Sequence, residues 1–252
     1  MLRTFAGGRL FGTRTGDGDP VVLAVHGWGR SHRDFDAVLR PVGRPELAAV
    51  AVDLPGFGAT PPPTERWGVA DYAASVAAVL DELGEPVVVL GHSFGGRVAL
   101  RLSVERPEAV RALVLTGSPL LRLAPPRRAP LSYRALRTAR RAGLVGEDRM
   151  ERARRRHGSA DYAAATGVMR QVHGRVVVED YEADLDEVRC PVTLVWGDDD
   201  ATVPLSVAEA ARARLERGAG IDVDLVVLRG AGHLVPLTSP GALREAVERR
   251  LR

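Results

Sequence analysis

Short apolar runs, each followed by a longer stretch of helical periodicity, dominate the chain. The apolar runs lack alternating polar residues, which is typical of strands buried on both faces of a parallel sheet. They cover residues 21–25, 47–52, 87–90, 112–115, 192–196 and 223–228. Helices are predicted at about residues 34–39, 69–83, 95–104, 206–217 and 240–251. This alternation predicts an α/β fold, in which a mostly parallel twisted sheet carries helices on both faces.

The alternation is interrupted once, between residues 119 and 188. This segment opens with a proline-rich stretch, continues as arginine-rich helical sequence and has no clear strand pattern. We expect a helical insertion that leaves the sheet after the strand at 112–115 and returns to it at Pro191. The predicted organisation is therefore a core of residues 1–118 and 189–252, with residues 119–188 inserted into it.

Composition sets the size and the cellular environment that we expect. With 252 residues, of which 45% are hydrophobic, the chain can bury one substantial core and at most a small accessory unit. Its one cysteine, Cys190, excludes an internal disulfide framework. No apolar segment has the length of a transmembrane helix, and residues 1–18 lack the features of a signal peptide. We therefore expect a cytoplasmic protein.

The charge of the chain gives little information about partners. The net charge is +3, and all 35 basic residues are arginines. The absence of lysine indicates a compositional bias of the genome rather than a basic surface selected for a function. No nucleic-acid-binding module is recognisable. We expect a small-molecule substrate, and neither nucleic acid nor membrane insertion; the sequence does not define the oligomeric state.

The strongest chemical signal surrounds Ser93. Residues 91–95, Gly-His-Ser-Phe-Gly, have the form Gly-x-Ser-x-Gly directly after the strand at 87–90 and directly before a predicted helix. The sharp turn strains the serine, and Gly91 and Gly95 lack the Cβ atoms that would collide there. The Ser93 hydroxyl then lies at a helix N-terminus, where negative charge is favoured. Ser93 is the candidate nucleophile, and a serine in an ordinary glycine-rich turn is the alternative.

In this context the motif resembles the nucleophile elbow of the α/β-hydrolase superfamily, whose triad runs along the chain as nucleophile, acid and histidine. The resemblance implies an acid after a later strand and a histidine after the last one. The strand at 223–228 leads into a small-residue loop that ends at His233. By this resemblance His233 is the general base; a histidine on a surface loop is the alternative.

The acid is implied by a second match. Residues 197–204, which follow the strand at 192–196, fit the family pattern Gly-x-x-Asp-x-x-Val-Pro, in which the aspartate belongs to the triad. This match selects Asp200. Asp198 and Asp199 remain alternatives, and are otherwise interpreted as loop carboxylates.

Two further loops resemble the family. His26, Gly27, Trp28 and Gly29 follow the first central strand and match its His-Gly-x-Gly motif. The resemblance implies that the backbone N–H groups of Trp28 and Phe94 form the oxyanion hole. His26 is then a structural residue that fixes the loop.

The other loop, residues 53–58, has the pattern Asp-x-Pro-Gly-x-Gly that is common in this superfamily. We interpret Asp53 as a structural turn residue that binds nearby backbone N–H groups.

Together these features predict a serine hydrolase that cleaves a carboxylic ester, thioester or lactone through an acyl-enzyme, without a metal or an organic cofactor. A carbon–carbon bond hydrolase with the same triad is an alternative. A non-catalytic receptor or scaffold on the same fold is another, because fold alone does not determine function. The serine at position 93 argues against haloalkane dehalogenases and epoxide hydrolases, which have aspartate there.

The insertion resembles the helical cap that covers the active site in this family. Residues 122–156 contain twelve arginines and three acidic residues. Some of these arginines could bind an anionic substrate, with Arg154, Arg155 and Arg156 as the positions to test; a solvated helix face is the alternative. Tyr162, Met169 and His173 are candidates either to line a pocket or to pack between cap helices.

Overall fold

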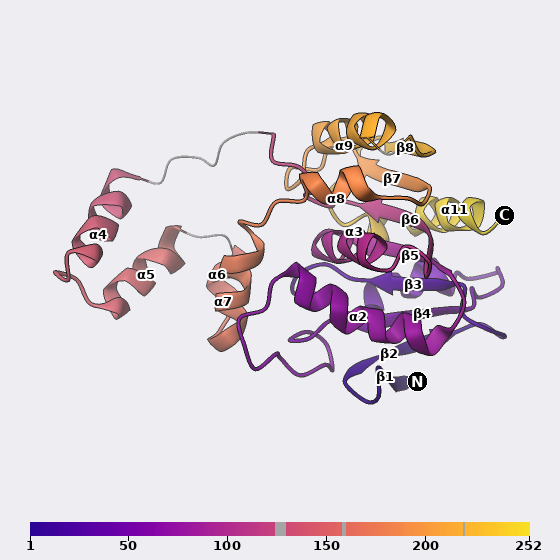
Figure 1. Cartoon of the computed structure of the whole chain (residues 1–252), viewed down its shortest axis with the longest axis horizontal. Helices are drawn as coiled ribbons and strands as arrows, with labels where there is room; N and C mark the ends of the chain where they lie inside the picture. Colours follow the sequence, from indigo (N-terminus) through magenta and orange to yellow (C-terminus); the bar gives the residue numbers. More distant parts are fainter. Residues whose placement is uncertain (124–129, 158–159, 219) are drawn as a thin grey trace.

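The central sheet of the protein has eight strands in the order β1-β2-β4-β3-β5-β6-β7-β8 (Figure 1). The computed structural model describes residues 1–123, 130–157, 160–218 and 220–252, without the side chains of 154–157 and 160. β1 and β2 run antiparallel to their neighbours and all other pairs are parallel. The strands are β1 (Leu2–Phe5), β2 (Leu10–Thr15), β3 (Val22–Val25), β4 (Ala49–Asp53), β5 (Val87–His92), β6 (Val110–Thr116), β7 (Val192–Gly197) and β8 (Val223–Leu228). The predicted fold class, with its mostly parallel sheet, is confirmed.

The two antiparallel strands were not predicted from the sequence. All six predicted strands are present, with ends shifted by a few residues, and they form the parallel part of the sheet. β2 contains Thr13, Arg14 and Thr15, of which the two threonines are buried and the arginine is exposed. This strand therefore lacks the continuous apolar run by which the others were recognised.

Helices cover both faces of the sheet. Successive side chains of β3 point to opposite faces, so that Leu23 packs in one apolar cluster and Ala24 in the other. The helices α2 (Val69–Leu83), α3 (Phe94–Glu105) and α9 (Leu205–Gly218) cover the first face, and α1 (Asp36–Leu39) and α11 (Pro240–Leu251) cover the second. Two short elements complete the core, η1 (His32–Phe35) and α10 (Val235–Thr238). None of the helices in the described ranges is long and apolar enough to cross a membrane.

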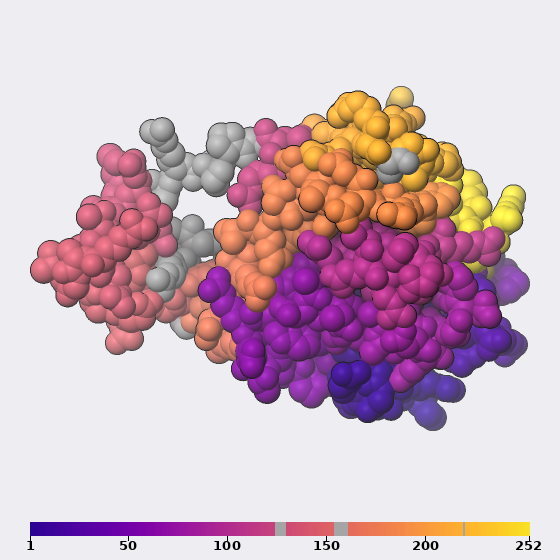
Figure 2. All heavy atoms as spheres, viewed as in Figure 1, coloured from indigo at the N-terminus to yellow at the C-terminus, as the bar shows by residue number. Residues whose placement is uncertain are grey.

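The segment between β6 and β7 contains helices and no strand within its described residues. Its helices are α4 (Leu131–Arg141), α5 (Glu147–His157), α6 (Ala160–Ala164), α7 (Gly167–Val176) and α8 (Glu182–Glu187). α4 and α5 project at one end of the molecule, away from the sheet (Figures 1 and 2). α8 instead lies on the core, where Arg214 of α9 forms ion pairs with Glu182 and Asp186. The side chains of Arg154, Arg155 and Arg156 lie outside the described residues, so the anion hypothesis stays open.

One arginine of the core contacts two separate parts of the inserted segment. Arg97, on α3, donates hydrogen bonds from Nε to the carbonyl oxygen of Pro119 and from Nη1 to that of Val176, each at 3.0 Å. Its guanidinium also lies 5.1 Å from the centre of the Tyr181 ring. These contacts hold the C-terminal end of α7 beside α3, the helix that begins directly after Ser93.

Candidate active site

Ser93 lies in a strained turn at the carboxyl end of β5. Its backbone has φ 52° and ψ −114°, in a region that residues other than glycine rarely adopt. The turn is held on both sides, because Ser93 N–H donates to the carbonyl oxygen of Thr116 at 2.9 Å and Gly96 N–H donates to that of Ser93 at 3.1 Å. The strain is thus maintained by the neighbouring strand and by the first turn of α3.

The glycines of the elbow allow α3 to approach the sheet closely. A Cβ atom on Gly91 would lie 2.6 Å from the Cα of Gly96, and one on Gly95 would lie 2.1 Å from the carbonyl oxygen of Val25. Larger residues at either position would push α3 away from β3 and β5. The close packing keeps the N-terminus of α3 directed at Ser93.

Three side chains from three strand ends meet at this turn. The Ser93 hydroxyl lies 3.1 Å from Nε2 of His233, and Nδ1 of His233 lies 2.9 Å from Oδ2 of Asp200. An ionised carboxylate only accepts hydrogen bonds, so Nδ1 carries the ring proton and Nε2 is free to accept the serine proton. The structure therefore brings together the serine, histidine and aspartate that the motifs selected, in the connected order that nucleophilic catalysis requires.

Asp200 is buried and its two oxygens have separate partners. Oδ1 accepts hydrogen bonds from the N–H groups of Thr202 and Val203, both at 2.8 Å, while Oδ2 faces His233. Burial alone would raise the pKa of this carboxyl group, but the bonds from His233 and the two N–H groups lower it below its usual value. Asp200 is therefore ionised at neutral pH.

The two neighbouring aspartates have other surroundings. Asp198 accepts a hydrogen bond from the N–H of Gly230 at 2.7 Å, and both Asp198 and Asp199 are exposed. Of the three candidates for the acid, Asp200 is the one whose carboxylate contacts His233.

His26 is buried and uses both ring nitrogens to fix the loop after β3. Nδ1 donates to the carbonyl oxygen of Gly27 at 2.7 Å, and Nε2 accepts a hydrogen bond from the N–H of Leu54 at 3.0 Å. Burial lowers the pKa of His26, which favours this neutral, doubly bonded ring. With both nitrogens occupied by the backbone, His26 has a structural role in this loop.

The loop after β3 lies directly against the nucleophile. A Cβ atom on Gly27 would lie 3.3 Å from the Cβ of Ser93, so the following residue, Trp28, is adjacent to the site. Within the described part of the chain, the backbone N–H groups of Trp28 and Phe94 donate no hydrogen bond. Two unpaired donors beside a candidate nucleophile are what an oxyanion hole requires. Gly29, the last residue of this motif, has φ +68°, in the left-handed region that favours glycine.

Aromatic rings cover this loop and contact the inserted segment. The Trp28 ring lies 4.9 Å from Phe57, 5.4 Å from Phe94 and 4.9 Å from His173, measured between ring centres. His173 is on α7, so this helix packs directly on the loop that carries the proposed oxyanion donor.

The other two candidates from the insertion also make packing contacts. The sulfur of Met169 lies 4.0 Å from the Tyr72 hydroxyl on α2, and the Tyr162 ring lies 5.9 Å from His173. α7 therefore packs on the core through Met169 and His173.

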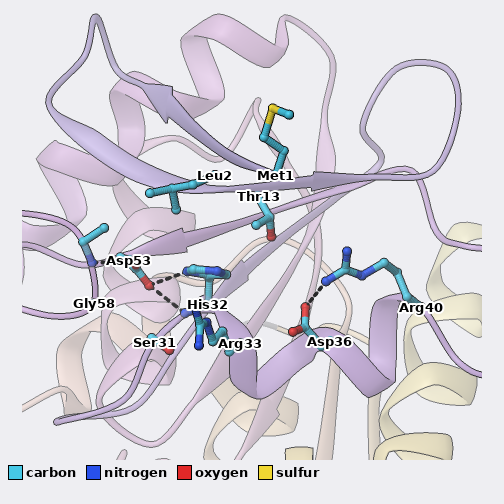
Figure 3. Close-up of a pocket in the computed structure, with 11 residues that line it drawn as sticks. Met1, Leu2, Thr13, Ser31, His32, Arg33, Asp36, Arg40, Asp53 and Gly58 are labelled. Carbon is cyan, nitrogen blue, oxygen red and sulfur yellow. Dashed lines mark hydrogen bonds and ion pairs between the residues drawn. The ribbon is translucent and has the colours of Figure 1, made fainter.

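Asp53 organises the turn that follows β4. Oδ1 accepts hydrogen bonds from the backbone N–H of His32 at 2.7 Å and from its Nδ1 at 2.8 Å, while Oδ2 accepts from the N–H of Ala59 at 2.8 Å (Figure 3). His32 and Asp53 lie at a cavity of about 620 Å³, whose lining does not include Ser93. The contacts of Asp53 are those of a structural turn residue.

Two residues at the site were not identified from the sequence. His92 Nε2 lies 3.0 Å from the backbone carbonyl oxygen of His233, and Gly117 lies against the His233 ring, where a Cβ atom would be 3.0 Å from Cε1 and Nδ1. His92 occupies the variable position of the elbow motif, and Gly117 follows the end of β6. Both residues contact His233, which is more than 100 positions away in the sequence. The one sequence feature that could have indicated a role at the site is the position of Gly117 directly after a strand.

Comparison with known proteins identifies the class of protein. Residues 21–246 match the model of the Alpha/beta hydrolase family, and the chain belongs to this family. Its relatives are named as esterases and hydrolases, and the chain is a hydrolase of this fold.

Among the relatives, the chain is similar to the pimeloyl-[acyl-carrier protein] methyl ester esterase of Aromatoleum aromaticum, with 31% identity over 88% of this chain and 94% of the relative. It is also similar to the 2-hydroxy-6-oxononadienedioate/2-hydroxy-6-oxononatrienedioate hydrolase of a Pseudomonas species, with 28% identity over 76% of this chain and 75% of that protein. A thermophilic esterase from Thermogutta terrifontis has the same fold, with a TM-score of 0.70 and 20% identity over 100% of this chain and 98% of that one.

Proposed function

We propose that the protein hydrolyses small-molecule carboxylic esters, thioesters or lactones through an acyl-enzyme on Ser93. The observation that carries this proposal is the continuous connection from the Ser93 hydroxyl to Nε2 of His233, at 3.1 Å, and from Nδ1 to Asp200, at 2.9 Å. The position of Ser93 at the N-terminus of α3 supports it, because helix N–H groups favour negative charge there.

The proposed reaction begins when the Ser93 hydroxyl attacks the carbonyl carbon and its proton moves to Nε2 of His233. Asp200 stabilises the positive imidazolium, and the N–H groups of Trp28 and Phe94 bind the oxyanion. As the tetrahedral intermediate collapses, the leaving alcohol, thiol or ring oxygen takes the proton from His233. A water molecule then gives a proton to His233 and attacks the acyl-enzyme. As this second tetrahedral intermediate collapses, His233 returns the proton to the Ser93 oxygen, and the acid is released.

An ester is the first substrate class to test. The relative from Aromatoleum aromaticum is named for a methyl ester substrate and covers most of this chain. Carbon–carbon bond cleavage with the same three residues is a second candidate, supported by the similarity to the Pseudomonas dienedioate hydrolase. The inserted residues 119–188 would act as the cap over this site, since α7 packs against Trp28 through His173.

A labelling experiment followed by a substrate panel tests the proposal. The protein is incubated with a fluorophosphonate, digested and analysed by mass spectrometry, and we expect the adduct on the peptide that contains Ser93. Aryl esters of increasing acyl length, methyl esters and vinylogous diketones are then compared. Faster cleavage of the diketones would favour the carbon–carbon reaction, and no labelling together with no turnover would contradict both.

Gly117→Ala should impair catalysis through the His233 ring. The new Cβ would lie 3.0 Å from Cε1 and Nδ1 of that ring, at a backbone φ of +56°. Because a displacement of about 1 Å can cost about 100-fold in rate, we expect kcat to fall roughly 10- to 100-fold with a smaller change in KM. Steady-state kinetics on an activated ester would measure this.

Gly84→Ala is the matched control for that variant. Gly84 also has a positive φ, +78°, but a Cβ there would meet no atom within 4 Å. It should show the same kind of backbone strain, seen as a lower melting temperature, with an unchanged kcat. Equal kcat losses in the two variants would show that backbone strain, and not contact with the ring, is responsible.

A further inference from the structure

His92 connects the nucleophile strand to the loop of the candidate base. It is the last residue of β5, directly before Ser93, and its side chain is buried. Its Nε2 lies 3.0 Å from the backbone carbonyl oxygen of His233. Among the described residues, that carbonyl accepts no other hydrogen bond. This bond is therefore a direct link between a central strand and the backbone at His233.

The partners of the His92 ring define its protonation. A carbonyl oxygen only accepts, so Nε2 must carry a proton. Burial, with a further contribution from the nearby His233, lowers the pKa of His92 to about 4, and the ring is neutral at neutral pH. A neutral imidazole has one N–H, which leaves Nδ1 unprotonated. Within the described part of the chain, Nδ1 has no hydrogen-bond partner.

The other edge of the ring faces the loop after β3. A Cβ atom on Gly27 would lie 3.0 Å from Nδ1 and 3.3 Å from Cε1 of His92. The ring thus lies between two segments, the loop that presents Trp28 and the loop that presents His233. Both loops are placed relative to β5, the strand that ends in Ser93.

We propose that His92 is a positioning residue, whose Nε2–H holds the His233 loop at the distance from Ser93 that proton transfer requires and whose ring supports the loop at Gly27. The proposal rests on the proposed function of Ser93 and His233. The His233 loop leaves the sheet after β8, the last strand, whereas β5 is central and fully buried. A bond from β5 therefore joins the loop to a buried central strand.

The test compares two substitutions that differ in the N–H group. His92→Leu removes the donor and keeps an apolar side chain, whereas His92→Gln places an amide N–H the same number of bonds from Cα as Nε2. For His92→Leu we expect roughly a 10- to 100-fold lower kcat with little change in KM, and a similar fall in the rate of fluorophosphonate labelling. His92→Gln should recover most of both rates.

Ser103→Ala is the control for loss of a buried polar group on the adjoining helix. The Ser103 hydroxyl donates to the carbonyl oxygen of Leu100 within α3, away from the reacting groups. It should lower thermal stability without lowering kcat. If His92→Leu does not fold, His92→Asn, whose amide is too short to reach the carbonyl, replaces it.

The outcomes separate this proposal from the proposed function. A folded His92→Leu protein with the kcat of the wild type would overturn the positioning role, as would equal losses in the leucine and glutamine variants, which would indicate packing alone. A wild-type protein that neither labels at Ser93 nor cleaves any ester would instead overturn the proposed function, and the role of His92 with it.

Discussion

Replacement of Ser93 by alanine should abolish turnover of an activated ester and leave the fold intact. The substitution removes the attacking oxygen, and in serine hydrolases loss of the nucleophile costs about 10⁶-fold in kcat. The residual rate should come from substrate binding and from the N–H groups of Trp28 and Phe94, which the substitution leaves in place. Steady-state kinetics of the purified variant against an activated ester would measure the loss.

The fold of the Ser93→Ala variant should survive because the hydroxyl has little part in packing. Alanine keeps the Cβ atom at the strained φ of 52°, so the backbone cost of the turn is unchanged. The side-chain bond lost is the one to His233, at 3.1 Å. A melting temperature near that of the wild type, with no labelling by fluorophosphonate, is the expected combination. Wild-type rates in a well-folded sample would remove Ser93 from the mechanism.

The parallel part of the sheet was predictable because most of its strands are buried on both faces. Val88 and Val89 of β5 pack into opposite apolar clusters, and this produces an unbroken apolar run in the sequence. β1 and β2 form the antiparallel end of the sheet, where Arg14 faces solvent beside buried Thr13 and Thr15. β1 pairs with β2, and β2 in turn pairs with β4, a long-range contact that the local sequence pattern does not reveal.

The candidate site likewise contains residues that the sequence identified and contacts that only the folded chain shows. Ser93 was selected by a motif within one turn of chain, and Asp200 and His233 by strand-end motifs that the family resemblance supplied. The preference for Asp200 over Asp198 and Asp199 gains support from contacts with a histidine 33 positions away. His92 was part of the elbow motif, but its bond to the carbonyl of His233 joins positions separated by 141 residues. Such a contact depends on the arrangement of β5 and β8 in the folded protein.

The sequence predicted a helical insertion at residues 119–188, but it did not predict how the helices of this segment pack. The loss of strand pattern after residue 118 marked its beginning. α8 packs on α3 and α9 through buried Leu185 and through ion pairs such as Arg101–Asp184 and Arg214–Asp186, which connect residues distant in sequence. The position of α7 over Trp28 likewise depends on Arg97, whose two bonds to Pro119 and Val176 are visible only in the folded chain.

Asp200→Asn should lower kcat by about 10⁴-fold, with a smaller effect on KM, through the tautomer of His233. The asparagine carbonyl oxygen would keep the bonds from the N–H groups of Thr202 and Val203, which Oδ1 of Asp200 accepts. The amide NH₂ would then face Nδ1 of His233, which could only accept. The ring proton would move to Nε2, and that nitrogen could no longer take the proton of Ser93.

The same variant should change how stability depends on pH. The folded pKa of Asp200 is below its ordinary value, because the bonds from His233 and two N–H groups outweigh burial. Its contribution to stability is therefore complete above the unfolded pKa, about 3.9, and is lost as the pH falls through the lower folded pKa. Asparagine does not titrate, so the stability difference between wild type and Asp200→Asn should shrink as the pH falls below about 4.

The neighbouring aspartates provide the matched controls for the kinetic effect. Asp198→Asn and Asp199→Asn remove the same charge from the same loop, but both side chains are exposed and His233 contacts Asp200 instead. Each should keep kcat within a few-fold of the wild type, because neither determines which nitrogen of the base carries the proton. A large loss in Asp199→Asn or Asp198→Asn, with near-normal kcat in Asp200→Asn, would assign the orienting role to the other carboxylate and require His233 to turn in the working enzyme.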